Sequence, residues 1–329
     1  MNNLDSPEMS VVLVTPDRYS TIRRTIKHLR AQTVRDKLEI VIVAPARDTL
    51  DLNDSELKGF RWVKMVEVSS IESIAEGNAM GVRQATSPVV VLAEDHSFPD
   101  PGWAEALIRA HKNPWAAVGP VVRNANPDSA ISWADFFIGY GPWSDPSPAG
   151  VVSHLPGHNS SYKREILLGY GDDLGSMLEA ETVLHWDLRS RGYQIYLEPA
   201  AKISHTNFSR ISSWIQVQFL AGRVFGATRS KNWHPLRRII YVIGSPLIPV
   251  VRFVRIISEM RKPGRLRNME VSIRVRILLA LVLGLILDGS GQFIGYAIGA
   301  GNSKGKLSVY ECHRFRHVTE GDRKAVFDR

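Results

Sequence analysis

The sequence contains a single cysteine, Cys312. One thiol can build neither an intramolecular disulfide framework nor a zinc site based on several cysteines, so both are excluded. The scarcity of cysteine favours a reducing compartment. The first ten residues also lack the basic and apolar segments of a secretory signal peptide, and we therefore expect any membrane contact to come from elsewhere in the chain.

Two further features are missing. No uninterrupted apolar run reaches the roughly 20 residues that a straight membrane-spanning helix needs. No G-x-G-x-x-G motif follows the first apolar run, which argues against a nicotinamide-dependent Rossmann enzyme. The composition is otherwise ordinary, with 44% hydrophobic and 22% charged residues, and excludes global disorder. A chain of 329 residues is long enough for one large α/β domain and an appended segment.

Charge is distributed unevenly along the chain. Residues 1–205 contain 20 Lys and Arg against 26 Asp and Glu, a net charge of −6, whereas residues 206–329 contain 21 against 7, a net charge of +14. A basic segment of this kind attracts nucleic acid or anionic lipid. The basic residues here flank apolar runs rather than aromatic stacking platforms, which favours an anionic membrane surface and argues against nucleic acid.

Short β-rich apolar runs alternate with helical patterns in the first 122 residues. The expected strands are 10–15, 38–44, 62–68, 88–93 and 116–122, and the expected helices are 73–85, 103–111 and one capped by Ser20 or Thr21. This alternation predicts a mostly parallel sheet with helices on both faces. Such sheets bind ligands at the carboxyl ends of their strands, so the informative residues should follow the apolar runs directly.

The alternation breaks at residues 124–151, which are rich in Pro, Gly, Ser and Trp. We expect a long excursion beside the site, with the function of a lid left open. Residues 179–191 predict a helix that ends at Gly192. Two short strands are expected after it, at 194–197 and 202–205.

The last third of the chain contains two apolar runs. Residues 239–251 are free of charge but broken by Gly and Pro, and residues 277–287 are followed by Asp288. Because arginines flank both runs, interfacial or re-entrant helices on an anionic leaflet explain the pattern best. A continuation to Ala300 would be long enough to span, but it would bring Asp288 near the middle of the membrane, where a carboxylate needs a partner. The alternative is a buried two-helix extension of a soluble core.

The strongest local motif is Glu94-Asp95-His96, which follows the fourth expected strand and precedes a Pro-x-Pro-Gly-Trp sequence. Carboxylate oxygens are ligands for hard divalent cations, and manganese also accepts imidazole. A cation held here could neutralise the charge of a diphosphate. The alternative is an acidic turn that caps the next helix.

Two later residues lie where a ligand edge is expected. Glu181 begins a helix whose Leu184 and Leu188 share a face by i+3 and i+4 spacing, so its carboxylate would be held at the helix start and could accept a proton from a hydroxyl. An acid in a first helical turn also favours the helix dipole, which is the structural alternative. His205 ends an expected strand; a lone histidine is more often structural than a ligand.

Together these segments resemble glycosyltransferase family 2, the inverting enzymes of the GT-A fold, over about residues 10–229. The resemblance implies a donor pocket formed by Thr15, Pro16, Asp17, Arg47, Asp48, Asn78, Glu94, Asp95 and Arg223. It implies a donor-sugar and acceptor region at Gly157, His158, Asn159, Ser160 and Glu179, with Glu181 as the catalytic base. It also implies a divalent cation, Mn²⁺ or Mg²⁺, held by Asp95, His96 and His205.

The sequence departs from the family pattern at three places. The acidic turn that usually follows the second strand is replaced by Ala44-Pro45-Ala46-Arg47-Asp48, so Arg47 or Asp48 would have to read the nucleotide base. The usual Glu-Asp pair at the base is Ala180-Glu181, and the third position of the metal motif is His96 instead of an acid.

The resemblance implies a Rossmann-like GT-A catalytic domain over residues 1–230. The charge and the apolar runs predict that residues 231–329 form a basic, hydrophobic, membrane-associated helical region and tail. The implied activity is transfer of a sugar from a nucleotide-diphosphate donor to a hydroxyl of a glycan or lipid-linked acceptor. We expect it at the cytoplasmic face of a membrane, attached through residues of about 236–300, with homo-oligomerisation left open. The alternative is an inactive family member that acts as a membrane scaffold or glycan-binding protein.

Overall fold

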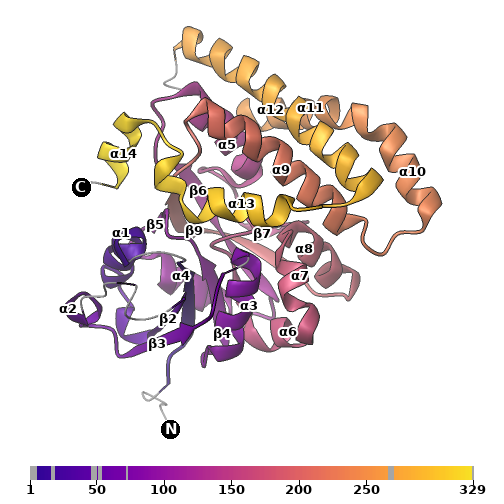
Figure 1. Cartoon of the computed structure of the whole chain (residues 1–329). Coiled ribbons are helices and arrows are strands. Elements are labelled where there is room, and N and C mark those ends of the chain that lie inside the picture. Colours follow the sequence, from indigo (N-terminus) through magenta and orange to yellow (C-terminus); the bar gives the residue numbers. More distant parts are fainter. Residues whose placement is uncertain are drawn as a thin grey trace. The chain divides into compact units, whose positions relative to one another are not determined.

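The computed structural model describes residues 6–15, 19–45, 50, 54–71, 73–265 and 270–327. Internal contacts divide the chain into two compact units (Figure 1). The first comprises Met1–Arg123 and Ser147–Ser204, and the second comprises Asn124–Pro146 and His205–Arg329. The boundary expected at residue 230 falls inside the second unit, and a functional division at that residue stays a prediction.

The described strands form one sheet. They are β1 (Met9–Val14), β2 (Leu38–Ala44), β3 (Trp62–Glu67), β4 (Val89–Ala93), β5 (Ser97–Pro99), β6 (Ala117–Asn124), β7 (Gly150–Val151), β8 (Ser161–Lys163) and β9 (Ile195–His205). Their order is β3-β2-β1-β4-β8-β6-β9-β5, with β7 beside β9. Strands β3, β2, β1 and β4 pair in parallel, whereas β8 runs antiparallel to both of its neighbours, so the sheet is mixed.

The core of the first unit lies on the parallel strands. Val11 of β1 is in register with Ile40 of β2 and Val91 of β4, and every residue of β1, β2 and β4 is buried. Such continuous burial, without alternation, is typical of strands covered on both faces. The apolar runs therefore predicted these strands correctly.

Seven α-helices and two 3-10 turns are described in the first unit. They are α1 (Tyr19–Arg30), η1 (Arg35–Lys37), α2 (Asp54–Leu57), α3 (Ile74–Gln84), α4 (Trp103–Ala110), α6 (Arg164–Leu168), η4 (Gly171–Asp173), α7 (Leu174–Leu178) and α8 (Glu181–Ser190). Ser73 caps α3 by accepting the Glu76 N–H at 3.1 Å. Gly192 follows α8 with φ +86°, the left-handed conformation expected after a helix. The cap expected at Ser20 or Thr21 is wrong, because α1 already begins at Tyr19.

The two short strands expected at 194–197 and 202–205 are one strand, β9, which continues through Pro199. Proline has no N–H to give to a neighbouring strand, which is why the sequence suggested a break. Next to it, the Ala200 N–H donates to the Glu198 carboxylate at 2.9 Å, so a side chain satisfies the local backbone. Strands β6 and β9 end at Asn124 and His205. The contacts of these two residues group them with the second unit, whereas the rest of each strand belongs to the first.

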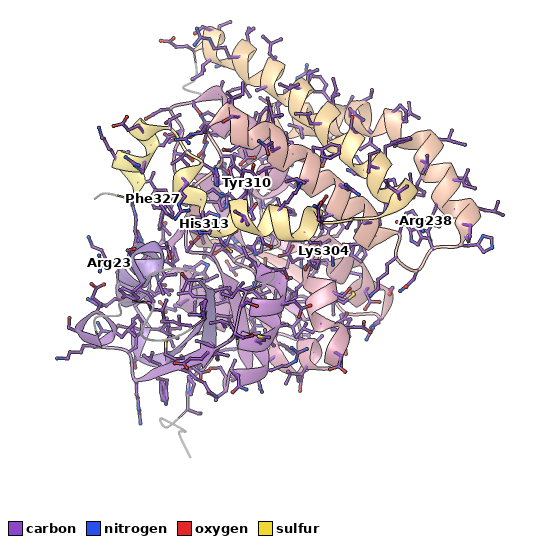
Figure 2. The ribbon with its side chains drawn as sticks, viewed as in Figure 1. Arg23, Arg238, Lys304, Tyr310, His313 and Phe327 are labelled. Carbon is purple, nitrogen blue, oxygen red and sulfur yellow. The ribbon has the colours of Figure 1, made fainter. Side chains whose placement is uncertain are left out.

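The second unit is helical in its described residues. Its elements are α5 (Ala130–Tyr140), η3 (Gly141–Trp143), α9 (Ile211–Arg229), α10 (Pro235–Gly244), η5 (Ser245–Leu247), α11 (Ile248–Met260), α12 (Val271–Ile298), α13 (Ser303–Cys312), η6 (Arg314–Arg316) and α14 (Glu320–Val326). The expected excursion at 124–151 thus contains α5, which contacts α12. On α13, Tyr310 donates to Gln216 Oε1 on α9 at 2.7 Å, which helps to hold these two helices together (Figure 2).

Helices α9 and α12 approach each other at glycines. A Cβ atom on Gly222 or Gly226 of α9 would meet the backbone of α12, and one on Gly291 or Gly295 of α12 would meet the backbone of α9. Both pairs have the small-xxx-small spacing that lets two helix backbones come close. This contact fixes α12 along one face, where Leu281, Leu285 and other residues are buried.

Asp288 lies on the buried face of α12, and its carboxylate is paired. Arg252 Nη1 of α11 lies 2.5 Å from Asp288 Oδ2, and Gln292 Nε2 donates to the same oxygen at 2.8 Å. Arg252 also donates to the Ile138 carbonyl oxygen at 3.1 Å. The acid that interrupts the apolar run therefore has the partner that its position required.

The two apolar runs have different surroundings. The run at 239–251 lies in the segment Pro235–Met260. By length and composition alone, this segment is long and apolar enough to cross a membrane. Only 11% of the residues in its apolar 18-residue stretch are buried. The run at 277–287 lies in α12, with one face against α9 and α5. The alternative expected from the sequence, a buried extension of a soluble core, therefore agrees with the inner face of α12. It does not agree with α10 and α11, which are mostly exposed.

We predict that Gly222→Ala destabilises the second unit, because the added methyl group has to push α12 away from α9. Overpacking of this kind costs about 1–3 kcal/mol. The free energy of unfolding, from denaturant titration, measures the effect. Gly139→Ala on α5 is the matched control, since a Cβ there meets no atom within 4 Å and alanine favours a helix. Equal stability of the two variants would contradict close backbone packing.

Candidate functional site

The motif Glu94-Asp95-His96 lies directly after β4, as expected, and all three residues are buried. The turn is tied to α1 by one side chain. Thr25 Oγ1 lies 3.2, 3.0 and 3.1 Å from the carbonyl oxygens of Glu94, Asp95 and Ser97. Since strand β4 and helix α1 both hold this turn, its acidic side chains are fixed at the carboxyl edge of the sheet.

The Glu94 carboxylate receives several hydrogen bonds. Ser97 Oγ donates to Oε2 at 2.9 Å, and Asn159 Nδ2 donates to the same oxygen at 2.8 Å. Asn159 has φ +64°, a left-handed conformation that asparagine tolerates better than most residues. The loop that the resemblance assigns to sugar binding thus contacts the metal motif through Asn159.

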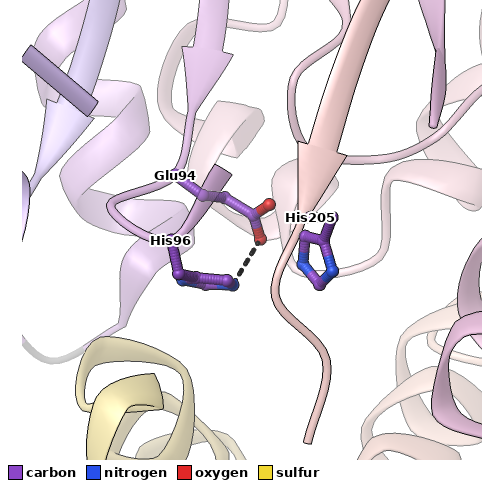
Figure 3. Close-up of side chains that lie close together, drawn as sticks. All are labelled: Glu94, His96 and His205. Carbon is purple, nitrogen blue, oxygen red and sulfur yellow. Dashed lines mark ion pairs between the residues drawn. The ribbon is translucent and has the colours of Figure 1, made fainter. Parts of the chain in front are cut away.

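Glu94, His96 and His205 form a group that could hold a metal ion (Figure 3). One ligand atom from each of them lies within 4.8 Å of the others, and His205 contributes from the end of β9. His96 Nε2 lies 3.5 Å from Glu94 Oε1, while its Nδ1 lies 2.6 Å from Asp95 Oδ1. His205 Nδ1 lies 3.0 Å from Asn207 Oδ1. Both rings therefore have a neighbour at Nδ1 that orients them, as metal-binding imidazoles usually do.

The donor set of this group differs from the expected one. His96 and His205 are both present, but Glu94 takes the place of Asp95, whose carboxylate faces the His96 ring. One carboxylate and two imidazoles suit Mn²⁺ better than Mg²⁺, which prefers oxygen ligands. The residues present therefore fit a divalent cation of the transition series, and the assignment of each ligand stays a prediction.

Glu181 lies at the start of α8, close to the same motif. His158 Nδ1 is 3.4 Å from Glu181 Oε1, and His158 Nε2 is 4.0 Å from Glu94 Oε1. A single imidazole thus separates two acids that are far apart in the sequence. Gly157 leaves the space for the Glu181 carboxylate, since a Cβ there would lie 2.6 Å from Oε2.

The surroundings of Glu181 favour proton acceptance. Burial raises the pKa of the Glu181 carboxyl, and the neighbouring His158 opposes this shift. A carboxylate with a raised pKa is a better general base near neutral pH than an ordinary one. Leu184 and Leu188 are buried as predicted, and they fix the helix that carries Glu181.

His185, one turn further along α8, supports the loop before Gly157. The Leu155 N–H donates to His185 Nδ1 at 3.3 Å, so this nitrogen accepts, and the neutral ring carries its proton on Nε2, 2.9 Å from Tyr162 Oη. Burial lowers the pKa of His185 to about 3. Nothing in the sequence indicated the contact of His185 with this loop.

The remaining predicted residues are placed as follows. Thr15 Oγ1 lies 2.8 Å from Thr21 Oγ1, and Asn78 is buried on α3. Ser160 Oγ donates to the Pro156 carbonyl oxygen at 2.5 Å, and Glu179 directly follows α7. Arg223 belongs to the second unit, where its Nε donates to the Gly299 carbonyl oxygen at 2.9 Å. Pro16, Asp17, Arg47 and Asp48 lie outside the described residues, and the roles of all these residues stay predictions.

The sequence reasoning missed three residues that hold the site together. Thr25, Ser97 and Asn207 contact the backbone or side chains of the metal motif and of His205. Ser97 and Asn207 lie within two residues of predicted ligands, so proximity in sequence could have indicated them. Thr25 is far from the motif in sequence, and only the packing of α1 brings it there.

The sequence model of glycosyl transferase family 2 matches residues 10–171. These residues include β4, the Glu94-Asp95-His96 motif, the loop at 157–159 and all of β1 except Met9. The chain carries a family 2 glycosyltransferase domain. Glu181 and His205 lie beyond the matched residues, but helix α8 and strand β9 place them close to the Glu94-Asp95-His96 motif. No curated protein sequence matches the chain significantly.

Two solved structures of glycosyltransferases match this chain at low sequence identity. The crystal structure of GalNAc-T7 with UDP, GalNAc and Mn²⁺ has a TM-score of 0.44 and 15% identity, over 61% of this chain and 44% of that chain. S. aureus TarS 1-349 in complex with UDP has a TM-score of 0.45 and 14% identity, over 84% of this chain and 89% of that chain. This chain thus spans less than half of the GalNAc-T7 chain. Both TM-scores are below 0.5, so the family assignment rests on the sequence match alone.

We predict that His185 makes the first unit sensitive to mild acid. Its pKa is about 3 in the folded state and about 6.5 when unfolded, so the unfolded chain binds more protons between these values. The stabilising contribution of the neutral ring is complete above pH 6.5 and is lost as the pH falls toward 3. Between pH 7 and pH 5, this amounts to about 2 kcal/mol.

Urea unfolding of His185→Gln at pH 7 and pH 5 measures this contribution. Glutamine can still accept the Leu155 N–H but does not titrate, so the loss of stability between the two pH values should be smaller than in the unaltered protein. His234→Gln, at an exposed histidine, should keep the full loss. An identical pH dependence in both variants would show that His185 is not held neutral.

Proposed function

We propose that the family 2 domain transfers a sugar from a nucleotide-diphosphate donor to an acceptor hydroxyl, with inversion at the anomeric carbon. The observation that carries this proposal is the position of Glu181. Its carboxylate is separated from Glu94 of the metal motif by the His158 ring alone. A proton acceptor and a site for a charged diphosphate are therefore close enough to act on one sugar.

The diphosphate lies beside Glu94, His96 and His205, the residues that would hold a cation, and Asp95 orients the His96 ring. A divalent cation, Mn²⁺ in preference to Mg²⁺, supplies positive charge there when it is bound. The remaining donor contacts are assigned to Thr15, Pro16, Asp17, Arg47, Asp48, Asn78 and Arg223. Gly157, His158, Asn159, Ser160 and Glu179 are assigned to the sugar and acceptor.

Glu181 accepts the proton of the acceptor hydroxyl as the oxygen attacks the anomeric carbon. The new carbon–oxygen bond forms on the face opposite to the leaving group. The bond between the anomeric carbon and the phosphate oxygen breaks, and the nucleoside diphosphate leaves with that electron pair. Because the attack comes from one side and departure occurs on the other, the configuration is inverted. The proposed acceptor is a glycan or lipid-linked hydroxyl presented at the cytoplasmic face of a membrane.

We expect Glu181→Gln to reduce sugar transfer at least 100-fold, the usual minimum for loss of a general base, because the amide cannot accept the proton. Binding of the nucleoside diphosphate should be nearly unchanged. Product formation from radiolabelled nucleotide sugars and calorimetric binding measure the two quantities. Glu165→Gln on the exposed side of α6 is the control and should keep full activity. Retained turnover in Glu181→Gln would refute the assignment of the base.

We expect uridine or guanosine diphosphate to stabilise the protein only together with Mn²⁺. At a ligand concentration about 100 times Kd, the melting temperature should rise by roughly 5 °C or more. The substitutions His96→Ala and His205→Ala should remove this metal-dependent rise, whereas His234→Ala should keep it. Stabilisation by the nucleotide that is independent of the metal and of both histidines would overturn the assigned metal site.

A further inference from the structure

Helices α10 and α11 present an apolar stripe to solvent. The exposed residues recur every three or four positions, so they lie on one face of the segment. They are Leu236, Ile239, Ile240, Ile243, Leu247, Val250, Val251 and Val254, with exposed fractions between 46% and 73%. A soluble monomer rarely leaves so many large apolar side chains together in water. This stripe therefore requires a partner.

A second apolar stripe lies on the neighbouring helix. α12 contacts α10 and α11, and its glycine-rich face is buried against α9. The other face exposes Val275, Leu279, Val282, Leu283, Ile286 and Phe293. Burial on one side and apolar exposure on the other are not typical of a helix that faces water. Helices α10, α11 and α12 therefore all expose apolar side chains.

Charge identifies the chemistry of the partner. Residues 231–300 contain eleven Lys and Arg against three acids. Two of these acids are already paired within the unit, Glu259 with Lys262 and Arg265, and Asp288 with Arg252. An apolar stripe with an excess of arginine beside it matches a lipid layer with anionic head groups. A water-soluble protein partner would not need this excess of positive charge.

Aromatic residues and arginines gather where α10 begins. Arg229 lies over the rings of Trp233 and Tyr241 at 5.2 and 4.7 Å, and Arg237 lies over Trp233 at 4.2 Å. The Trp233 ring stacks on Tyr296 of α12 at 5.9 Å. Arg238, labelled in Figure 2, donates to the Tyr296 carbonyl oxygen at 3.1 Å. Tryptophan, tyrosine and arginine are the side chains that concentrate at the head-group level of membranes.

The packing of α12 indicates how the layer meets the lipid. A span by Pro235–Met260 would draw α12 into the hydrocarbon, and α9 with it, because α9 and α12 are in backbone contact. Yet α9 contains Arg223 and Arg229, and its Gln216 is exposed. Polar side chains of this kind are costly inside a bilayer. If the segment instead lies in the plane of the membrane, only the apolar stripes enter the lipid and α9 stays in water.

We infer that α10, η5 and α11 lie in the plane of an anionic membrane, with their apolar stripe inserted into one leaflet and α12 beside them. The second unit is then a monotopic anchor that enters and leaves the lipid on the same side. This inference goes beyond the transfer reaction and does not depend on it. The anchoring surface is defined as Leu236, Ile239, Ile240, Ile243, Leu247, Val250, Val251 and Val254.

Flotation of the full chain with lipid vesicles tests the partner. Binding should be strong to phosphatidylcholine vesicles containing phosphatidylglycerol, weaker to phosphatidylcholine alone, and reduced by salt. Leu247→Glu and Ile243→Glu should each lower the partition coefficient roughly tenfold or more, since each loses its buried apolar surface. Val309→Glu on α13 is the matched control, because Val309 is 59% exposed but lies outside the anchoring surface.

Spin labels at three positions of the anchoring surface test the orientation. Cys312 is buried, so single cysteines at Ile240, Leu247 and Val254 can be labelled selectively, with Cys312→Ser as a check. An in-plane segment places all three labels at one similar, shallow depth, measured by collision with oxygen and with a water-soluble nickel complex. A spanning segment would place Leu247 deepest and the two others near opposite surfaces, which would overturn the inference.

Two further results would also overturn it. The first is equal binding of the unaltered chain and of Leu247→Glu to anionic vesicles. The second is no binding to vesicles together with self-association in light scattering that Leu247→Glu abolishes, which would make the stripe an interface between two copies of the chain. Both measurements use the intact protein and do not require the donor sugar to be known.

Discussion

A buried carboxylate at the carboxyl end of a strand needs hydrogen-bond donors, and the arrangement of the site follows from how Glu94 obtains them. Ser97 and Asn159 donate to one of its oxygens, while the rings of His96 and His158 face the other. To reach Glu94, Asn159 adopts a left-handed conformation, and the same loop carries Gly157 against Glu181. The loop that donates a hydrogen bond to Glu94 therefore also lies against the Glu181 carboxylate.

The second unit obeys a different constraint. Glycines let α9 and α12 come into backbone contact, and Arg252 forms an ion pair with Asp288 in the same unit. These contacts use one face of α12 and leave α10 and α11 exposed. One side of this helical layer is packed and has its charges paired, and the other side is apolar and exposed. Such a layer is suited to hold a transferase against lipid, where the proposed acceptor of the enzyme would be found. The proposed base Glu181 and the Glu94 motif belong to the first unit, whereas the proposed anchor belongs to the second.

Much of the local structure was readable from the sequence. The apolar runs predicted β1, β2 and β4 because buried parallel strands need uninterrupted apolar residues. Ser73 and Gly192 marked helix ends because their conformations and hydrogen bonds are local. The break expected in β9 was wrong, since the Glu198 carboxylate satisfies the backbone next to Pro199. That contact depends on a side-chain direction that a residue pattern does not contain.

The sequence by itself determined the family of the domain, the strand that delivers the Glu94 motif and the unequal charge of the two ends, because each depends on residue order alone. Only the tertiary structure decided that Glu94, rather than Asp95, groups with His96 and His205. Adjacent side chains after a strand point in different directions, and the contacts of the turn with Thr25 and Asn159 select which one faces the site. The tertiary structure also decided which face of α12 is buried, since a helix that is apolar all round does not specify its own neighbours.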